Sequence, residues 1–72
     1  MKLFIFKTNI ENHRIERKVN TVLAYTPGVL DWSVDMEDID KVLRIEASDS
    51  SEESSMIELV RTCGLECEAL AD

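Results

Sequence analysis

Apolar residues in this chain follow two different spacings in turn, and the order of these spacings restricts the fold. Residues 3–6 form an aromatic and β-branched run with Phe4 and Phe6 on one face, which is typical of a strand. Helical spacing follows, at Ile15, Val19, Val22 and Leu23. We expect Asn12 to cap the start of this helix and Pro27-Gly28 to end it.

Two strands come next. The first begins at Val29 and places Trp32 and Val34 on one face. A polar turn then leads into a second strand over residues 42–47, in which Leu43, Ile45 and Ala47 alternate onto the inward face. Two strands joined by a short polar loop form a hairpin, so we expect them to be antiparallel neighbours.

The last part of the chain predicts a helix followed by a strand. Ser50-Ser51-Glu52-Glu53 fits a capping box, and acidic residues favour the positive N-terminus of a helix. Helical spacing continues through Met56, Ile57, Val60 and Cys63. Gly64 is expected to end this helix, and residues 65–70 alternate as a final strand.

This β-α-β-β-α-β order with short loops predicts an α+β, ferredoxin-like sandwich, in which a four-stranded antiparallel sheet carries both helices on one face. At 72 residues, the chain is expected to be a single domain over residues 1–72. The residues expected in the core are Phe4, Phe6, Ile15, Val19, Leu23, Trp32, Leu43, Ile45 and Val60. Leu3, Ile5 and Val42 are expected on the uncovered face of the sheet, where an apolar strip could form a dimer contact.

The net charge of the chain restricts the kinds of partner that it is expected to bind. Eight Lys and Arg against 15 Asp and Glu give a net charge of −7, and nucleic acid is not an expected partner because phosphate binding needs a basic surface. No apolar run approaches the roughly 20 residues that span a bilayer, so we expect a cytoplasmic protein without membrane insertion. Against this acidic background, Arg14, Arg17 and Lys18 share one face of the first helix. They predict a docking surface for a protein partner with an acidic surface.

Few residues are suited to catalysis. The chain has one histidine and two glycines, with no grouping typical of a nucleophilic triad or a phosphate loop, so we do not expect an enzyme. Cys63 and Cys67 continue apolar patterns, which favours reduced, buried thiols over a disulfide scaffold. In this fold the second helix ends on the side of the first strand–helix loop. Cys63 could therefore instead join His13 and Glu11 as a metal ligand.

Five short segments spread over nearly the whole chain match a known family in residue type and position. They are Lys7-Thr8-Asn9-Ile10, Pro27-Gly28-Val29, Trp32-x-Val34-Asp35, Lys41-Val42-Leu43 and Gly64-Leu65. In these segments the chain resembles the heavy-metal-associated domain, the family of copper metallochaperones and of small N-terminal domains of metal-transporting P-type ATPases. The resemblance implies the same fold and a place in metal transport.

The resemblance also locates the family's metal loop. The family holds Cu(I) between the two thiolates of a Met-x-Cys-x-x-Cys motif on the loop into the first helix. Counting back without gaps from Gly28 places this motif at residues 10–15. Ile10 then stands at the methionine position, Asn12 and Ile15 at the cysteine positions, and His13 between them. The resemblance thus covers the family's scaffold but not its paired thiolates.

Three functions follow as hypotheses. The first is a heavy-metal-associated-like domain without the thiolate pair, which serves as a protein-interaction or regulatory module and needs no cofactor. The second is a metal-ion carrier that binds Cu(I) or Zn(II) through His13 and Cys63. The third is a small-molecule-sensing ferredoxin-like domain that binds across the edge of a dimer. We expect a monomer or a weak dimer.

Overall fold

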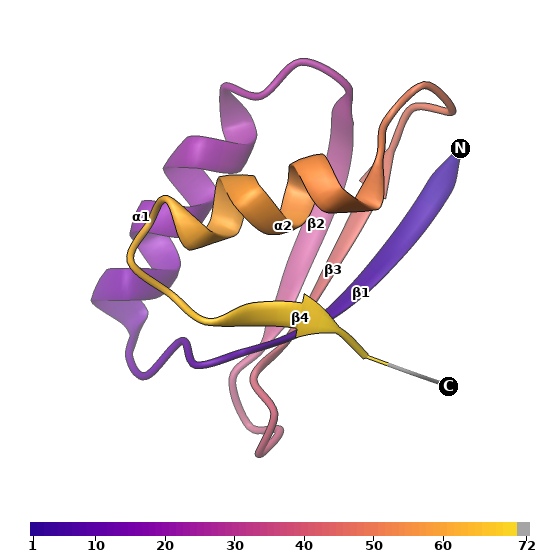
Figure 1. Ribbon diagram of the computed structural model, residues 1–72. Helices are drawn as coiled ribbons and strands as arrows, with labels where there is room; N and C mark the ends of the chain where they lie inside the picture. The colour runs from indigo at the N-terminus through magenta and orange to yellow at the C-terminus, as the bar shows by residue number, and fades with distance from the viewer. Residues whose placement is uncertain (71–72) are drawn as a thin grey trace.

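The computed structural model describes residues 1–70, which form a single sheet with two helices packed on one of its faces (Figure 1). The order along the chain is β1 (Lys2–Thr8), α1 (His13–Ala24), β2 (Val29–Asp35), β3 (Val42–Ala47), α2 (Glu53–Arg61) and β4 (Cys67–Ala69). All strand pairs are antiparallel, and the order in the sheet is β2-β3-β1-β4. The predicted ferredoxin-like α+β fold is therefore confirmed. Neither helix in the described part of the chain is long and apolar enough to cross a membrane.

The core lies between the helices and the covered face of the sheet. Seven of the nine residues expected there are buried: Phe4, Phe6, Val19, Leu23, Leu43, Ile45 and Val60. Ile15 and Trp32 are only partly buried, but both pack against this core. The indole N–H of Trp32 donates a hydrogen bond to Asn20 Oδ1 over 2.8 Å, so its polar edge is satisfied at the rim of the core.

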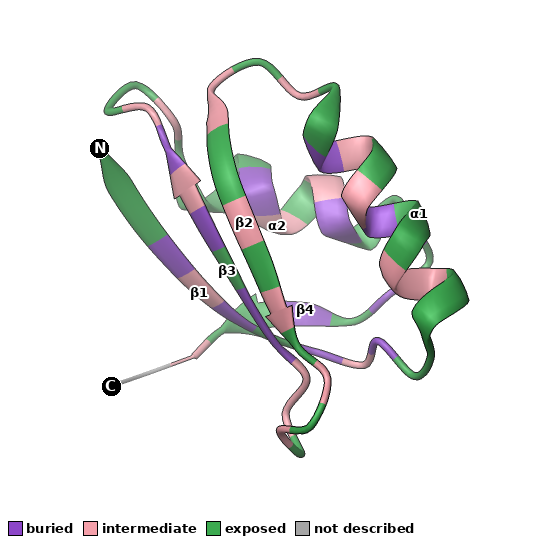
Figure 2. Ribbon diagram, turned by 180° about the vertical axis from the view of Figure 1, so that it is seen from behind, coloured by how far each residue is buried: buried purple, intermediate pink, exposed green. Residues whose placement is uncertain are grey.

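The opposite face of the sheet has no helix over it, and buried and exposed residues alternate along its strands (Figure 2). Leu3 is 55% exposed and Ile5 is partly buried, as expected for this face. Val42 differs, because it is only 7% exposed although it lies outside the main core cluster. The apolar strip on the uncovered face is therefore smaller than the sequence indicates.

The first helix begins as predicted and the second does not. Asn12 is the N-cap of α1, and its side-chain oxygen accepts the Ile15 backbone N–H at 3.0 Å. At α2 the N-cap is Glu52, and no side chain caps the helix, so the predicted capping box is wrong. The serine hydroxyls bond with one another instead, since Ser48 Oγ lies 3.2 Å from Ser50 Oγ and 3.1 Å from Ser51 Oγ.

The predicted final strand is shorter than its alternation indicates. Only Cys67–Ala69 form β4, because the Glu66 backbone N–H is bonded to the Asn9 side chain (2.9 Å). At the other end, one further bond joins the Leu70 N–H to the Ile5 carbonyl at 3.0 Å. Gly64 has a φ of +83°, as expected of a glycine that ends a helical turn.

We expect a Gly28→Ala substitution to lower the free energy of unfolding by about 1–2 kcal/mol or more, because Gly28 has a φ of +90° and a Cβ there would come within 3.1 Å of Ser51 Oγ. Gly64→Ala is the matched control. It has a similar positive φ, but its Cβ would meet open space. Urea unfolding of both variants measures the difference. An equal loss in the two would show that the close packing at Gly28 contributes nothing.

Candidate functional site

The loop between β1 and α1 uses its side chains for folding. Ile10 is fully buried, and its backbone N–H donates to Thr8 Oγ1 at 3.4 Å. Asn12 is exposed, yet its side-chain oxygen is engaged by the Ile15 N–H. Ile15 packs its side chain against the core. The residues at the three motif positions therefore anchor the loop, cap the helix and fill the edge of the core.

His13 is the first residue of α1 and is open to solvent. Its side chain is 82% exposed, and Nδ1 lies 2.8 Å from Glu16 Oε1, one helical turn further along. A carboxylate at this distance orients the imidazole ring along the helix. The structure thus gives His13 a partner on its own helix.

The two cysteines are both buried free thiols. Cys63 Sγ lies 3.9 Å from the Leu59 carbonyl oxygen, a distance suited to a weak S–H donor. Burial raises the pKa of Cys67 to about 11, while the nearby charge of Arg61 acts in the opposite direction. Cys67 is therefore a neutral thiol at physiological pH.

No group of three or more His, Cys, Asp and Glu side chains placed to hold a metal ion occurs among residues 1–70. His13 and Cys63 each have a different partner, Glu16 for the first and the Leu59 carbonyl for the second. The metal site predicted from these two residues remains a prediction, which the experiment below addresses.

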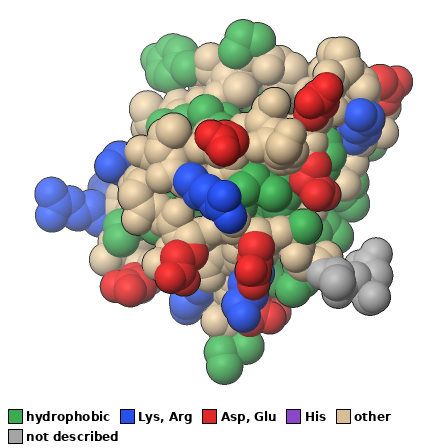
Figure 3. All heavy atoms as spheres, viewed as in Figure 1, with side chains coloured by type: hydrophobic (Ala, Val, Ile, Leu, Met, Phe, Trp, Pro, Cys, Tyr) green, Lys and Arg blue, Asp and Glu red, His purple; other side chains and the backbone are tan. Residues whose placement is uncertain are grey.

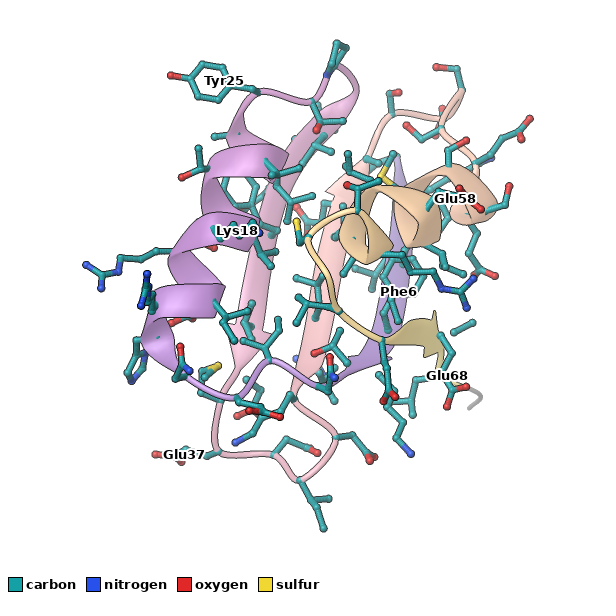
Figure 4. All side chains as sticks on the ribbon, turned by 60° about the vertical axis from the view of Figure 1, so that its left-hand side comes forward. Phe6, Lys18, Tyr25, Glu37, Glu58 and Glu68 are labelled. Carbon is teal, nitrogen blue, oxygen red and sulfur yellow. The ribbon has the colours of Figure 1, made fainter. Side chains whose placement is uncertain are left out.

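The basic face of α1 divides into two parts. Arg14 and Arg17 are exposed, and neither takes part in an ion pair within residues 1–70. Lys18 is also exposed, but its Nζ donates to the Cys63 carbonyl at 3.4 Å and so joins α1 to the turn that follows α2. Figure 4 labels Lys18 on α1. A cation at a helix C-terminus satisfies carbonyls that have no partner within the helix.

Two features of this region could not be predicted from the sequence. The contact of Lys18 with α2 joins residues 45 positions apart. A pocket of about 570 Å³ also lies beside β4 and is lined by Lys7, Thr8, Arg61, Leu65, Glu66, Cys67 and Glu68. No local spacing signals either of them, because both depend on how α2 and β4 fold back on the first half of the chain.

The fold is shared with solved structures of copper-binding domains. The yeast copper transporter domain Ccc2a, studied in its apo and Cu(I)-loaded states, matches 100% of this chain and 99% of its own, with a TM-score of 0.84 and 19% identity. A copper-binding domain of HMA7, a P-type ATPase, matches 99% of this chain and 96% of its own, with a TM-score of 0.86 and 19% identity.

A chain from the Atx1–Cu(I)–Ccc2a complex also matches, over 100% of this chain and 99% of its own, with a TM-score of 0.85 and 19% identity. A scan of the sequence against family models finds no match, and neither does a search of curated proteins. At 19% identity, the agreement concerns the path of the backbone over its full length. This chain has the fold of the copper-binding heavy-metal-associated domains, in a sequence that contains no Cys-x-x-Cys motif.

Proposed function

We propose that this chain, as a single unit over residues 1–72, is a protein-interaction or regulatory module in metal transport that does not carry metal through paired thiolates. The observation that supports this most strongly is what occupies the two cysteine positions. Asn12 caps α1, and Ile15 packs against the core. The proposed setting is the cytoplasm, the proposed state a monomer or weak dimer, and no enzymatic activity is proposed.

The donor atoms at the loop do not fit Cu(I). Cu(I) prefers soft thiolate and thioether sulfur, and the family's two cysteines supply it. Asn12 offers an amide oxygen that already accepts a backbone N–H, and Ile15 offers no donor atom. Burial raises the pKa of Cys67 to about 11, so its thiolate is disfavoured at neutral pH. We therefore assign no step of metal transfer to this loop.

Competition with a Cu(I) chelator at neutral pH tests this proposal. We expect the protein to remove no Cu(I) from a chelator of nanomolar affinity. Stoichiometric binding tighter than that would overturn the proposal. Cys63→Ser and His13→Ala then show whether the metal sits at the alternative site, because loss of binding in both variants would assign Cu(I) to these two residues. The same titration with Zn(II) tests whether the chain binds that metal.

The proposed docking surface for an acidic partner is the exposed face of α1 formed by Arg14 and Arg17, with Lys18 at its edge. Two guanidinium groups without ion pairs in the described chain stand out on a molecule of net charge −7. A domain of this fold occurs in a complex of two proteins, Atx1 and Ccc2a, which is consistent with a docking role. Complementary charge acts mainly on the rate of association and on partner choice.

We expect a double substitution, Arg14→Glu with Arg17→Glu, to reduce binding to an acidic partner by slowing association. Lys18 is left in place because its bond to α2 also serves the fold. Binding should weaken as salt rises, since the Debye length falls from about 10 Å at 0.1 M to about 3 Å at 1 M. Surface plasmon resonance on partners captured at low salt measures both effects.

Lys2→Glu with Arg44→Glu is the matched control for this prediction. It changes the net charge equally, but on β1 and β3 rather than on α1. If this control slows association as much as the helix variant does, the effect comes from overall charge, and α1 is not the docking surface.

A further inference from the structure

The sheet has two edges, β2 and β4, and hydrogen bonding shows which way the backbone of β4 faces. Glu68 pairs with Lys7 of β1, the Leu70 N–H bonds to the Ile5 carbonyl, and the Glu66 N–H bonds to the Asn9 side chain. Backbone groups in an antiparallel pair point alternately toward and away from the partner strand. The N–H and C=O groups of Cys67 and Ala69 therefore point to the free edge.

The other edge of the sheet is protected over the first half of β2. The pairing of β2 with β3 is interrupted by an irregularity between Val29 and Asp31. The backbone N–H of Trp32 is taken by the Asp31 carboxylate at 2.9 Å, so it is not available to another strand. Bulges and acidic side chains are common ways of closing an edge strand to further pairing. β4 is short and carries Glu68, but no side chain within residues 1–70 takes the outward N–H groups of Cys67 and Ala69.

The pocket of about 570 Å³ lies beside β4, with residues of both β1 and β4 in its lining. Arg61 of α2 and Leu65 of the following loop line it together with β4 residues Cys67 and Glu68. In the space-filling view of this face, acidic side chains surround a small hydrophobic area beside a basic side chain (Figure 3). The pocket thus combines a strand edge with apolar contacts and charge.

The charges around the pocket indicate the charge of the ligand that it binds. Lys7 is paired with Asp40 at 3.7 Å. Glu66 and Glu68 are exposed and form no ion pair within residues 1–70, whereas Arg61 is the one unpaired cation of the lining in that part of the chain. Two free carboxylates against one guanidinium, on a molecule of charge −7, favour a basic ligand.

We propose that the free edge of β4 and the pocket beside it bind an extended, lysine- or arginine-rich segment of a partner polypeptide, which adds to the sheet as a fifth strand. Backbone bonds to Cys67 and Ala69 supply the pairing, and Glu66 and Glu68 select for basic side chains. This surface is separate from the α1 face. It binds a basic segment, whereas the α1 face is proposed to bind an acidic partner.

A fluorescent heptapeptide of alternating valine and lysine is the probe, with an alternating valine and glutamate peptide for comparison. We expect the basic peptide to bind, seen as a rise in polarisation and as shifts of the Cys67 and Ala69 amide signals. Ala69→Pro should lower the affinity for the basic peptide at least tenfold, because proline removes an outward N–H without removing the bonds to β1. Ala69→Val keeps this N–H and should retain binding.

Charge variants give a second measurement. Glu66→Gln with Glu68→Gln should lower the affinity for the basic peptide several-fold. Glu11→Gln with Glu37→Gln changes the net charge equally and should not lower this affinity. Glu37 lies well away from Glu68 (Figure 4). The proposal is overturned if no basic peptide binds at 1 mM, if the acidic peptide binds better, or if Ala69→Pro binds like Ala69→Val. Substitution of Arg14 and Arg17 should leave this binding unchanged, which separates it from docking on α1.

Discussion

Replacing Phe6 with alanine is expected to lower the free energy of unfolding by about 3–5 kcal/mol. Phe6 is fully buried on β1, opposite Leu43 of β3 and Ala69 of β4. Its ring stacks on that of Phe4, with centroids 6.1 Å apart and planes 8° from parallel. The ring lies where the central strand meets both neighbours, as Figure 4 shows. The surrounding strands cannot easily close the cavity that its loss would leave.

Chemical denaturation with far-UV detection measures this loss. A domain of this size holds only a few kcal/mol of stability, so the variant is expected to be largely unfolded at 37 °C. Leu3→Ala on the same strand is the control, because Leu3 is 55% exposed on the opposite face. We expect it to cost less than about 1 kcal/mol. Similar losses of stability in both variants would contradict the orientation of β1, in which Phe6 points into the core and Leu3 points away from it.

The double substitution Asn12→Cys with Ile15→Cys is expected to create a Cu(I) site with paired thiolates on the loop into α1. It places two thiols on the loop into α1 in a Cys-x-x-Cys spacing, and the N-terminus of a helix favours the thiolate form. Loss of the Asn12 cap should cost about 1 kcal/mol, which a metal bound to both sulfurs offsets. Chelator competition should show one Cu(I) per chain, with a rise in melting temperature on loading.

The matched control places serine at the same two positions. Asn12→Ser with Ile15→Ser leaves side chains of similar size but without thiols, so we expect it to bind no Cu(I). If the cysteine variant folds and still fails to bind, the loop geometry differs from that of the copper-binding neighbours. Restoring the two thiols would then not be sufficient to form the site.

The fold could be predicted from the sequence because its elements depend on local spacing. Phe4 and Phe6 alternate, Val19 and Leu23 recur at four residues, and Asn12 caps the helix that follows it. The start of α2 was misjudged because serine hydroxyls have more than one partner. Ser50, the expected cap, and Ser51 both lie within hydrogen-bond distance of Ser48 instead.

The candidate site was only partly predictable for a different reason. The exposure of Arg14 and Arg17 follows from the helical pattern. The bond of Lys18 to the Cys63 carbonyl and the pocket beside β4 depend on contacts between distant parts of the chain. Glu66 belongs to a segment that alternates like a strand, yet its N–H is bonded to Asn9 instead. Alternation alone cannot reveal such a competing partner.

The central position of β1 bears on the order of folding events. Its first neighbour, β3, lies about half the chain away, and its second, β4, lies near the other end, with Thr8 opposite Cys67. Contacts between such distant segments form slowly, because a long loop of chain must close before they yield any stabilisation. During synthesis the hairpin of β2 and β3 can form early, while the β1–β4 ladder must wait for residues 67–69. Until then Phe6 lacks one wall of its packing, and the outer edge of β1 in the nascent chain is open to other molecules.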